Sequence, residues 1–348
     1  MKEKIEISVI MSTHNTNESF LKLAIISVLN QTIKNIELII VNDGGHNLKT
    51  IQEFEDNRII IINHKETEGL PISLNEAISI SKGKYIARMD SDDISKLDRL
   101  QIQKEYLDRN QHIDICATFY KKFYEENTFI INPFFNYKYI EAQLFFKNVI
   151  AHPSIMFRKS FLKENNLKYS QEYCYSQDFE LWTRCLKKGN IALIPKLGLY
   201  YRIHGNQIRS YKKEEQRSLY NRVLIRNLTE LNLDISNLRY LEMLNGNDSD
   251  IDFENLLNFV NTVIKKNKKL KIYDEKAFER ILYNKCFNLI LKRKKYKYLT
   301  KKMNLKILFC KLNYTQLFIK IYLKVKLYLT CFFDNTYRMC KNIERKIK

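Results

Sequence analysis

The sequence lacks the marks of secreted, zinc-binding and membrane-spanning proteins. Its seven cysteines form no CxxC pair and no Cys/His zinc spacing, and an odd, scattered set indicates reduced thiols in a cytosolic setting. The start, MKEKIEISVIMSTHN, contains neither the apolar core nor the cleavage site of a signal peptide. No uninterrupted apolar run reaches the roughly 18 residues that a plain transmembrane helix needs. Nothing directs export, so we expect a cytoplasmic protein.

Glycine is scarce as well, at 8 of 348 residues, and the glycine-rich loops that cradle phosphate groups are absent. No GxGxxG follows the first predicted strand. The Gly83-Lys84 pair has Ile78 where a P-loop needs its first glycine. A chain of this sequence that bound a diphosphate would have to rely on a metal ion for most of the phosphate contacts.

Acidic residues are in the minority, with 39 Asp and Glu against 59 Lys and Arg, which gives a net charge of +20 and an isoelectric point near 9.4. This excess predicts attraction to anions, such as nucleic acid, acidic lipid or a phosphorylated substrate. A Lys-, Asn- and Ile-rich composition spread over a solvated surface explains the same charge without any partner.

The last 48 residues carry about half of that charge, with twelve Lys and Arg against two acidic residues. Within them, the strongly apolar segment 316–333 contains three lysines, and a lysine at the centre of a bilayer costs roughly 2.5–3.5 kcal/mol. These lysines are Lys320, Lys324 and Lys326. The combination favours a segment at the membrane surface. A helix packed on the main domain and a strand over 319–329 are the alternatives.

The first 120 residues alternate apolar or period-2 runs with helical periodicity, which is typical of βαβ units and a largely parallel sheet. Strands are predicted at 5–11, 36–42, 58–63, 84–89 and 113–118. Between the first two, one apolar helix face is formed by Leu21, Ala24, Ile25, Val28 and Leu29. Further helices are predicted over 71–82 and 96–109. The second is expected to turn three leucines inward, Leu97, Leu100 and Leu107.

Residues 130–210 mix both patterns. A strand is predicted at 152–160, a helix at 177–189 and a final strand at 198–205. After about residue 211 the sequence becomes Lys-rich with helical periodicity, as in the apolar stripe of 216–231. We therefore place a domain boundary near 210, between an α/β domain over 1–210 and a helical region over 211–348.

Three carboxylates are crowded into the sequence YIARMDSDD, directly after a predicted buried strand. In an extended segment the side chains of Asp90 and Asp92 point the same way, and two ionised carboxylates that close repel unless a cation lies between them. A hard divalent cation is the usual partner. The spacing does not fit an EF-hand, because Ser95 and Gln101 stand where that loop needs Gly and Glu. The simpler alternative is that Asp92 or Asp93 caps the following helix.

Polar residues also follow other predicted strand ends, namely Thr13, Asn15 and Asp43. In open α/β sheets ligands bind beyond the carboxyl ends of the strands. A divalent metal held by one or two carboxylates is commonly completed by phosphate oxygens. The pattern therefore predicts a diphosphate site at this edge of the sheet.

Six sequence blocks occur in the order seen in the family 2 glycosyltransferases of the GT-A fold, and the chain resembles that family over about residues 5–210. The blocks are ISVIMSTHN, SVLNQTIKNIELIIVNDGG, GLPISLNEAISISKGKYIARMDSDDISKLDRLQIQ, HPSIMFRKS, SQDFELW and YYRIHGNQIRS. Six blocks in register are far more specific than a DxD motif alone. The resemblance implies an α/β fold with a Rossmann-like mixed sheet flanked by helices.

The resemblance also implies a nucleotide-sugar site. The DxD carboxylates of the family bind a divalent metal, Mn²⁺ or Mg²⁺, that bridges the donor diphosphate, which implies metal binding by Asp92 and Asp90. His204 resembles the family histidine that approaches the metal. The acid of VNDGG implies uracil recognition by Asp43 and hence a UDP-sugar donor. The other implied nucleotide-sugar residues are Thr13, His14, Asn15, Asn75, Asp90 and Ser91.

Two positions depart from the family pattern, because His14 stands where Tyr is most frequent and Gly45 stands where Ser is usual. Base stacking on His14 is still expected. Asp93 is expected to support its loop. Arg202 and Arg209 are expected either to assist the phosphates or to be surface charges.

The block SQDFELW resembles the one that carries the catalytic base, which implies Asp178. An acceptor hydroxyl must lose a proton as it attacks the anomeric carbon in line with the departing nucleoside diphosphate. One base opposite one metal implies a single displacement with inversion. Glu180 is the reserve candidate, and a helix N-cap is the alternative role of Asp178. Trp182 is expected in the core or at an acceptor-side wall, and His152 in the fold.

The sequence thus predicts an inverting, metal-dependent hexosyl- or N-acetylhexosaminyltransferase. It would add a sugar to a hydroxyl of a lipid-linked or polysaccharide acceptor in cell-surface glycan synthesis, with peripheral membrane contact through the basic C-terminal region. No nucleic acid is expected, because no RRM, KH or zinc-finger pattern accompanies the charge. A non-catalytic donor-binding scaffold and an enzyme like the nucleotide-sugar pyrophosphorylases remain alternatives, although MSTHNTNES lacks the glycine loop of the latter.

Overall fold

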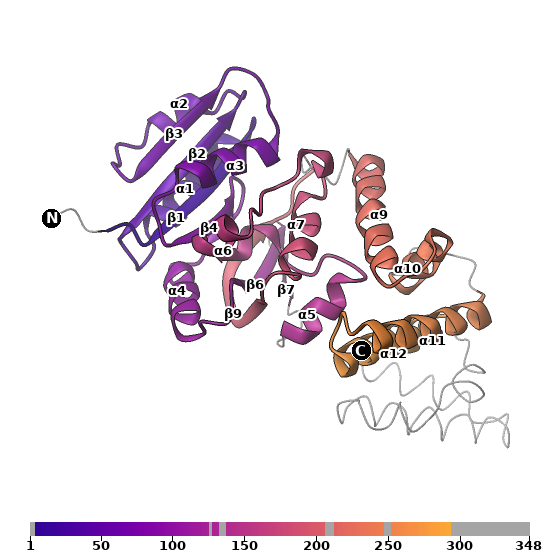
Figure 1. Cartoon of the computed structure of the whole chain (residues 1–348). Coiled ribbons are helices and arrows are strands. Elements are labelled where there is room, and N and C mark those ends of the chain that lie inside the picture. The colour runs from indigo at the N-terminus through magenta and orange to yellow at the C-terminus, as the bar shows by residue number, and fades with distance from the viewer. Residues whose placement is uncertain (1–3, 125–126, 132–136, 206–211, 247–251, 294–348) are drawn as a thin grey trace, which may run out of the picture. The chain divides into compact units, whose positions relative to one another are not determined.

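The computed structural model describes residues 4–124, 127–131, 137–205, 212–246 and 252–293 (Figure 1). Nine strands of these ranges form one sheet. They are β1 (Ile7–Thr13), β2 (Ile36–Asp43), β3 (Ile59–His64), β4 (Tyr85–Asp90), β5 (Ile94–Ser95), β6 (Ile115–Tyr124), β7 (Asn127–Ile131), β8 (Ile155–Arg158) and β9 (Ile191–Arg202). Their order is β3-β2-β1-β4-β8-β6-β9-β5, with β7 paired to β6 outside this path.

The sheet is mixed, because β3, β2, β1 and β4 are parallel whereas β8 is antiparallel to both β4 and β6. The helices are α1 (Glu18–Leu29), α2 (Leu48–Gln52), α3 (Leu70–Ile80), α4 (Arg99–Arg109), α5 (Tyr137–Leu144), α6 (Lys159–Glu164), α7 (Gln177–Cys185), α9 (Lys213–Glu230), α10 (Leu238–Leu244), α11 (Phe253–Leu270) and α12 (Glu275–Lys292). Helices such as α3, α4 and α6 pack against the strands. The predicted mixed sheet flanked by helices is confirmed.

The parallel strands lie close to where the sequence places them. Every residue of β2 is buried, which is the continuous apolar run expected of a parallel strand covered on both faces. Helix α1 buries Leu21, Ala24, Ile25 and Val28, as predicted, and Leu29 of the predicted face is partly buried against the same core. It is capped by Asn17, whose side chain accepts hydrogen bonds from two backbone N–H groups of the first turn.

The prediction is wrong at the start of α4. The helix begins at Arg99, so Leu97 precedes it and is 58% exposed, whereas Leu100 and Leu107 are buried. The cause is the short strand β5, which keeps the chain extended after the acidic cluster. The N-cap position of α4 is Asp98, so the alternative that Asp92 or Asp93 caps this helix is also wrong.

Three later segments have different bounds from those predicted. The strand expected at 152–160 is limited to β8, because His152–Ser154 form a 3₁₀ turn and α6 starts directly after β8. The helix expected at 177–189 ends at Cys185, although the Gly189 N–H still donates to the Cys185 carbonyl at 2.9 Å. The strand expected at 198–205 is the second half of β9.

Strand β4 is where the sheet reverses direction, and it is held close to β1. The Gly83 N–H donates to the Ser8 hydroxyl at 2.8 Å, and a Cβ at Gly83 would lie 2.5 Å from the Ser8 nitrogen. After Asp90 the chain turns into β5, which pairs with the C-terminal half of β9. We call residues 90–93 the acidic turn. This topology places it beside the end of β9.

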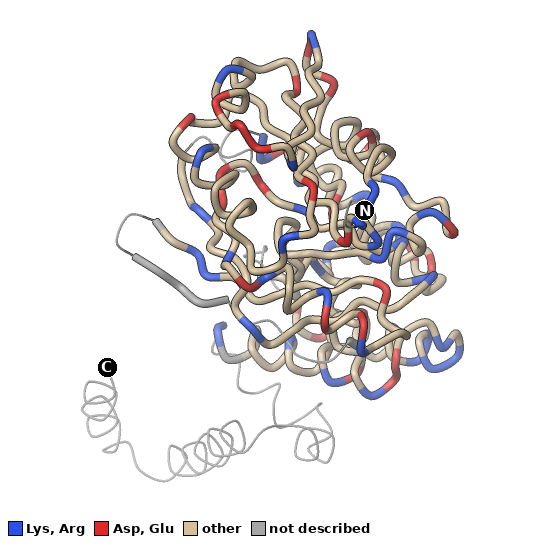
Figure 2. The backbone as a smooth tube through the Cα atoms, turned by 90° about the vertical axis from the view of Figure 1, so that its left-hand side faces the viewer, with Lys and Arg blue, Asp and Glu red and all other residues tan. Residues whose placement is uncertain are grey.

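Residues Met1–Ile281 form one compact unit, and Leu282–Lys348 form a second. The change of composition near 210 coincides with no break in packing, because α9 packs on α7 and α10 packs on α9. The different roles predicted for 1–210 and 211–348 therefore stay a prediction. Within the described ranges, basic and acidic positions are interspersed along the backbone (Figure 2). The segment 316–333, predicted to lie at a membrane surface, is outside those ranges.

Candidate active site

The carboxyl ends of the parallel strands bring three of the predicted nucleotide residues to one edge of the sheet (Figure 1). Thr13 ends β1, Asp43 ends β2 and Asp90 ends β4. The Thr13 hydroxyl donates to the side-chain oxygen of Asn47 at 3.0 Å, and Asn47 is fully buried. The end of β1 is therefore fixed from beneath by a buried amide.

The loop after β1 connects these strand ends. The Nδ1 atom of His14 lies 2.8 Å from the Asp43 carbonyl oxygen. Asn15 adopts the left-handed conformation, with φ of 53°. The hydroxyls of Thr16 and Ser91 are 2.7 Å apart, which links this loop to the acidic turn. The residues predicted to hold the nucleotide are thus neighbours in space.

Asp43 is a buried acceptor with three donors. One carboxylate oxygen accepts from His64 Nδ1 at 2.8 Å and from the Glu68 N–H at 2.9 Å, and the other accepts from the Gly69 N–H at 2.9 Å. Burial on its own would raise the pKa of Asp43, but these hydrogen bonds outweigh burial and hold the pKa below its usual value. Asp43 is therefore ionised and fixed in direction.

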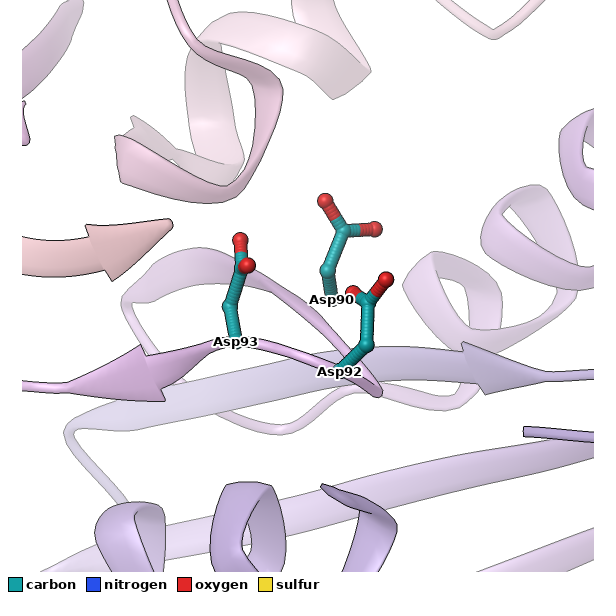
Figure 3. A group of neighbouring side chains, drawn as sticks. All are labelled: Asp90, Asp92 and Asp93. Carbon is teal, nitrogen blue, oxygen red and sulfur yellow. The ribbon is translucent and has the colours of Figure 1, made fainter. Parts of the chain in front are cut away.

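The three carboxylates of the acidic turn project to one side of it (Figure 3), and ligand oxygens of Asp90, Asp92 and Asp93 all lie within 4.8 Å of one another. Asp93 is fully buried, and its Oδ2 atom has no hydrogen-bond partner among the described residues. Burial, reinforced by the charges of Asp92 and Asp90, raises the pKa of Asp93 well above its usual value. Three crowded carboxylates, whose negative charges oppose one another, form a donor set that fits a hard divalent cation.

The end of β9 fixes the acidic turn from the other side. The Arg202 N–H donates to Asp93 Oδ1 and the Arg202 Nε–H donates to the Asp92 carbonyl oxygen, both at 2.8 Å. His204 Nε2 lies 2.8 Å from Asp92 Oδ2, so the structure brings together two of the three predicted metal ligands. The Arg202 guanidinium lies over the rings of Phe20 and Phe123, 4.1 and 4.6 Å from their centroids.

Two buried arginines lie beneath the acidic turn. Arg88 is 1% exposed and forms an ion pair with Asp90. Arg99 is fully buried, donates to the carbonyl oxygens of Pro153 and Arg88, and has its pKa lowered to about 10 by burial. These cations offset part of the negative charge that the acidic turn concentrates in the core.

Asp178 approaches the acidic turn from α7. Its Oδ2 accepts from the side-chain amide of Asn148 at 2.6 Å, and its Oδ1 accepts from the Phe179 N–H at 2.7 Å. Its charge is close enough to Asp90 to help burial raise the pKa of that residue. The N-cap position of α7 is Ser176, so Asp178 is not the helix cap that the alternative proposed.

Glu180, the reserve candidate, is engaged elsewhere. It is 2% exposed, and its Oε1 accepts from Arg184 and Arg226 at 2.7 Å each. Burial opposes its charge, but the two guanidinium groups hold its pKa below the usual value. A carboxylate held between two arginines is a poor base, so the geometry favours Asp178.

The family model for Glycosyl transferase family 2 matches residues 8–165. A glycosyltransferase of Methanocaldococcus jannaschii, itself uncharacterised, is 36% identical over 230 residues, which cover 63% of this chain and 78% of that protein. This chain belongs to glycosyltransferase family 2.

Two other relatives of this glycosyltransferase are bacterial. The O-antigen biosynthesis glycosyltransferase WbnJ of Escherichia coli is 35% identical over 57% of this chain and 80% of its own length. The Escherichia coli UDP-Glc:alpha-D-GlcNAc-diphosphoundecaprenol beta-1,3-glucosyltransferase WfaP is 29% identical over 60% of this chain and 82% of its own length.

Among solved structures, S. aureus TarS 1-349 in complex with UDP-GlcNAc matches with a TM-score of 0.53 at 15% identity, covering 84% of this chain and 92% of that TarS 1-349 chain. This likeness supports the predicted GT-A fold of the glycosyltransferase. No helix in the ranges that the structure describes combines the length and apolar character needed to cross a membrane.

Some of the residues singled out from the sequence have their side chains engaged away from the candidate site of the glycosyltransferase. The side-chain amide of Asn75 is bonded to the backbone N–H and carbonyl of Tyr169, both at 2.9 Å. Trp182 is fully buried and packs on His152 and Phe157, so of its two predicted places it occupies the core. His152 is buried as well, as predicted. Arg209 lies outside the described residues.

Several residues of the site were not singled out from sequence. They are Asn47, His64, Arg88, Arg99 and Asn148. Two of them carried a usable signal, because Arg88 is a charge inside a predicted buried strand, and His64 follows a strand predicted one residue too short. Asn148 carried none, because it lies in a stretch without a clear pattern.

Proposed function

We propose that this glycosyltransferase transfers a sugar from a UDP-sugar to an acceptor hydroxyl in a single displacement with inversion, and that Asp178 is the base. The observation that carries the proposal is that one site combines the carboxylates of the acidic turn with a further carboxylate, that of Asp178. Asp178 is on α7 and its charge acts on Asp90 at the end of β4, while Glu180 is held in ion pairs with two arginines.

In this mechanism Asp43 accepts a hydrogen bond from the base of the donor, and Thr13, His14 and Asn15 line the nucleotide pocket. Asp178 removes the proton of the acceptor hydroxyl as its oxygen forms a bond to the anomeric carbon. The bond between that carbon and the diphosphate oxygen breaks with its electron pair going to the oxygen. Asn148 keeps the Asp178 carboxylate directed by its hydrogen bond.

The residues that would hold a divalent cation, Mn²⁺ or Mg²⁺, are Asp92, Asp90 and His204. When bound, such an ion stabilises the negative charge that develops on the leaving diphosphate. Oxygen ligands with one imidazole suit Mn²⁺ slightly better than Mg²⁺. Asp93 lies deeper and is tied to Arg202, so its role is to shape the turn.

The proposed acceptor is a lipid-linked or polysaccharide glycan. Support comes from the relatives WbnJ, an O-antigen biosynthesis glycosyltransferase, and WfaP, a glucosyltransferase named for a diphosphoundecaprenol-linked sugar. The donor sugar is expected to be a hexose or an N-acetylhexosamine. We place the enzyme at the inner face of the cytoplasmic membrane, with the basic C-terminal residues in contact with anionic lipid.

The first test is calorimetric titration of UDP with Mn²⁺ and then with excess chelator, on the unmodified chain and on three isosteric variants. Asp178→Asn should bind UDP and Mn²⁺ as the unmodified chain does, yet lose at least about 100-fold in transfer, since general base catalysis contributes about 10²–10⁴-fold. Asp92→Asn should weaken metal-dependent UDP binding and transfer together.

The matched control is Glu180→Gln, which changes a carboxylate two positions from Asp178 on the same helix. It should retain most of the transfer activity per folded molecule. Equal loss of UDP binding in Asp178→Asn and Asp92→Asn would contradict the assigned roles. Metal-dependent UDP binding without transfer from any UDP-sugar would favour the donor-binding scaffold instead.

A further inference from the structure

His64 lies between two carboxylates that come from different elements. It is the last residue of β3 and is paired in register with Asp43 at the end of β2. Its Nδ1 atom is 2.8 Å from Asp43 Oδ1, and its Nε2 atom is 2.7 Å from Glu76 Oε2 on α3. The imidazole side chain is 12% exposed and that of Glu76 is 42% exposed.

This arrangement needs a protonated ring. A neutral imidazole has one N–H, whereas two ionised carboxylates can both be served only by the imidazolium, in which both nitrogens donate. Burial by itself lowers the pKa of His64, but the hydrogen bonds and charges of Asp43 and Glu76 raise it above the usual value. Two other titratable residues lie beside Asp43. His14 contacts the Asp43 backbone carbonyl through Nδ1, and Glu68 contacts the Asp43 carboxylate only through its backbone N–H.

We infer that His64 is a positioning residue for nucleotide recognition, and that its imidazolium, anchored by Glu76, holds Asp43 in the orientation that accepts the base of the donor. The inference rests on the proposed role of Asp43. It adds a dependence on pH: the nucleotide binds more tightly when His64 is protonated.

The direction of the effect follows from the raised pKa. Below the raised pKa the ring is charged, and both hydrogen bonds are present. As the pH rises through the raised pKa, the ring loses one proton, and Asp43 and Glu76 compete for the N–H that remains. Affinity for UDP should therefore fall by about three- to tenfold across that pH range, the value of one ordinary hydrogen bond.

Two substitutions of His64 distinguish the effect of its hydrogen bond to Asp43 from the effect of its protonation. In His64→Asn the side-chain amide nitrogen can occupy the place of Nδ1 and donate to Asp43 at any pH. The part of the pH dependence of UDP affinity that comes from the His64 ring should therefore disappear. In His64→Gln the nitrogen lies near the place of Nε2, so Asp43 loses its donor and affinity should be low throughout. Both variants bind the same ligand, so the ionisation of UDP itself cancels in the comparison.

The experiment is UDP titration from pH 5.5 to pH 9 on the unmodified chain and both variants, with NMR of the His64 ring and thermal unfolding measured in parallel. In the unmodified chain we expect UDP affinity to fall as the pH rises through the pKa of His64 measured by NMR. In His64→Asn this fall should be absent, and in His64→Gln UDP should bind more weakly at every pH. A Glu76→Gln variant should lower the NMR pKa of His64.

Parallel pH profiles in the unmodified chain and in His64→Asn would overturn the inference, and so would an NMR pKa at or below 6.5. These results leave the proposed function untouched as long as UDP still binds. Absence of UDP binding in the unmodified chain at every pH would instead contradict the proposed function. Equal unfolding temperatures among the variants exclude a merely structural role.

Discussion

The roles of the acids in this site are set by the groups that surround each carboxylate. Asp43 accepts from three donors and is a fixed acceptor. Glu180 is held by two arginines. Asp178 accepts from a neutral amide, so the hydrogen bond directs it without cancelling its charge. In the proposed mechanism the same functional group would therefore serve recognition, packing and proton transfer, according to its partners.

The partners of Glu180 predict a stability effect. Replacing Glu180 by Gln leaves Arg184 and Arg226 without their buried counter-charge and should lower the free energy of unfolding by about 2–4 kcal/mol. Asp178→Asn should lower it by only about 1 kcal/mol, because the asparagine oxygen can still accept from one of the two donors, Asn148 or Phe179. Urea unfolding of the two variants checks this difference. A larger loss in Asp178→Asn would show that the roles of the two acids are reversed.

The ion pairs of Glu180 with its two arginines also predict how the stability contributed by Glu180 depends on pH. Its pKa is lowered in the folded chain, so this contribution is complete above the unfolded value of about 4.5 and is lost as the pH falls through the lower folded value. In Glu180→Gln that part of the acid sensitivity should disappear. Unfolding measured from pH 6 down to pH 3 tests it, and an unchanged acid slope would contradict it.

At the residue scale, the sequence located acids better than their supports. Asp43 and the acidic turn were visible because each follows a predicted buried strand. The supports were less visible, because Asn47 and Asn148 are assigned only by contacts from distant elements. Arg88 carried a signal, as a charge inside a predicted buried strand, but its ion pair with Asp90 was not predicted. Asn75 shows the reverse case, since its amide is bonded to the backbone of Tyr169, a contact that no local pattern encodes.

At the scale of elements, α9 extends the site beyond the segment that matches the family model. The Asn148 N–H donates to the Tyr220 hydroxyl at 3.1 Å, and the Tyr220 ring stacks on Phe179 with centroids 4.7 Å apart. Phe179 is the neighbour of Asp178 on α7. One residue of α9 therefore supports both the proposed base and the amide that directs it.

Tyr220→Phe should uncouple this support. The change keeps the ring and removes the acceptor of the Asn148 N–H, so transfer should fall about three- to tenfold while UDP affinity stays within twofold. Tyr240→Phe on α10 is the matched control, because Tyr240 also stacks on a phenylalanine but contacts Arg239 instead of the site. A comparable loss of transfer in both variants would show a general effect of these helices.

The elements themselves follow periodicity where the pattern is long. The parallel strands and α1 were predictable because buried strands and amphipathic helices repeat one signal over many residues. The two-residue strand β5 was not predictable, since its existence depends on pairing with β9, which comes about 100 positions later. Its presence explains why α4 starts late and why Leu97 is exposed.

At the scale of the whole molecule, the basic C-terminal residues predict binding to anionic membranes. Changing Lys320, Lys324 and Lys326 to Glu should reduce association with anionic liposomes at least about tenfold, at about 1 kcal/mol per basic residue. The matched control changes three exposed lysines of the first unit, Lys163, Lys188 and Lys196. Neutral liposomes should bind neither variant. Equal loss in the control would mean that overall charge, and not this segment, governs binding. Deleting residues 300–348 should have the larger effect.

The contact between Arg202 and the acidic turn has a consequence for synthesis. Asp93 and the N–H that fixes it are 109 residues apart in the chain. At about 5–20 residues per second, a ribosome exposes the three aspartates roughly 5–20 seconds before it completes β9. During that interval the crowded acids lack the hydrogen bonds from Arg202, so the nascent domain can bury the acidic turn only after β9 has emerged.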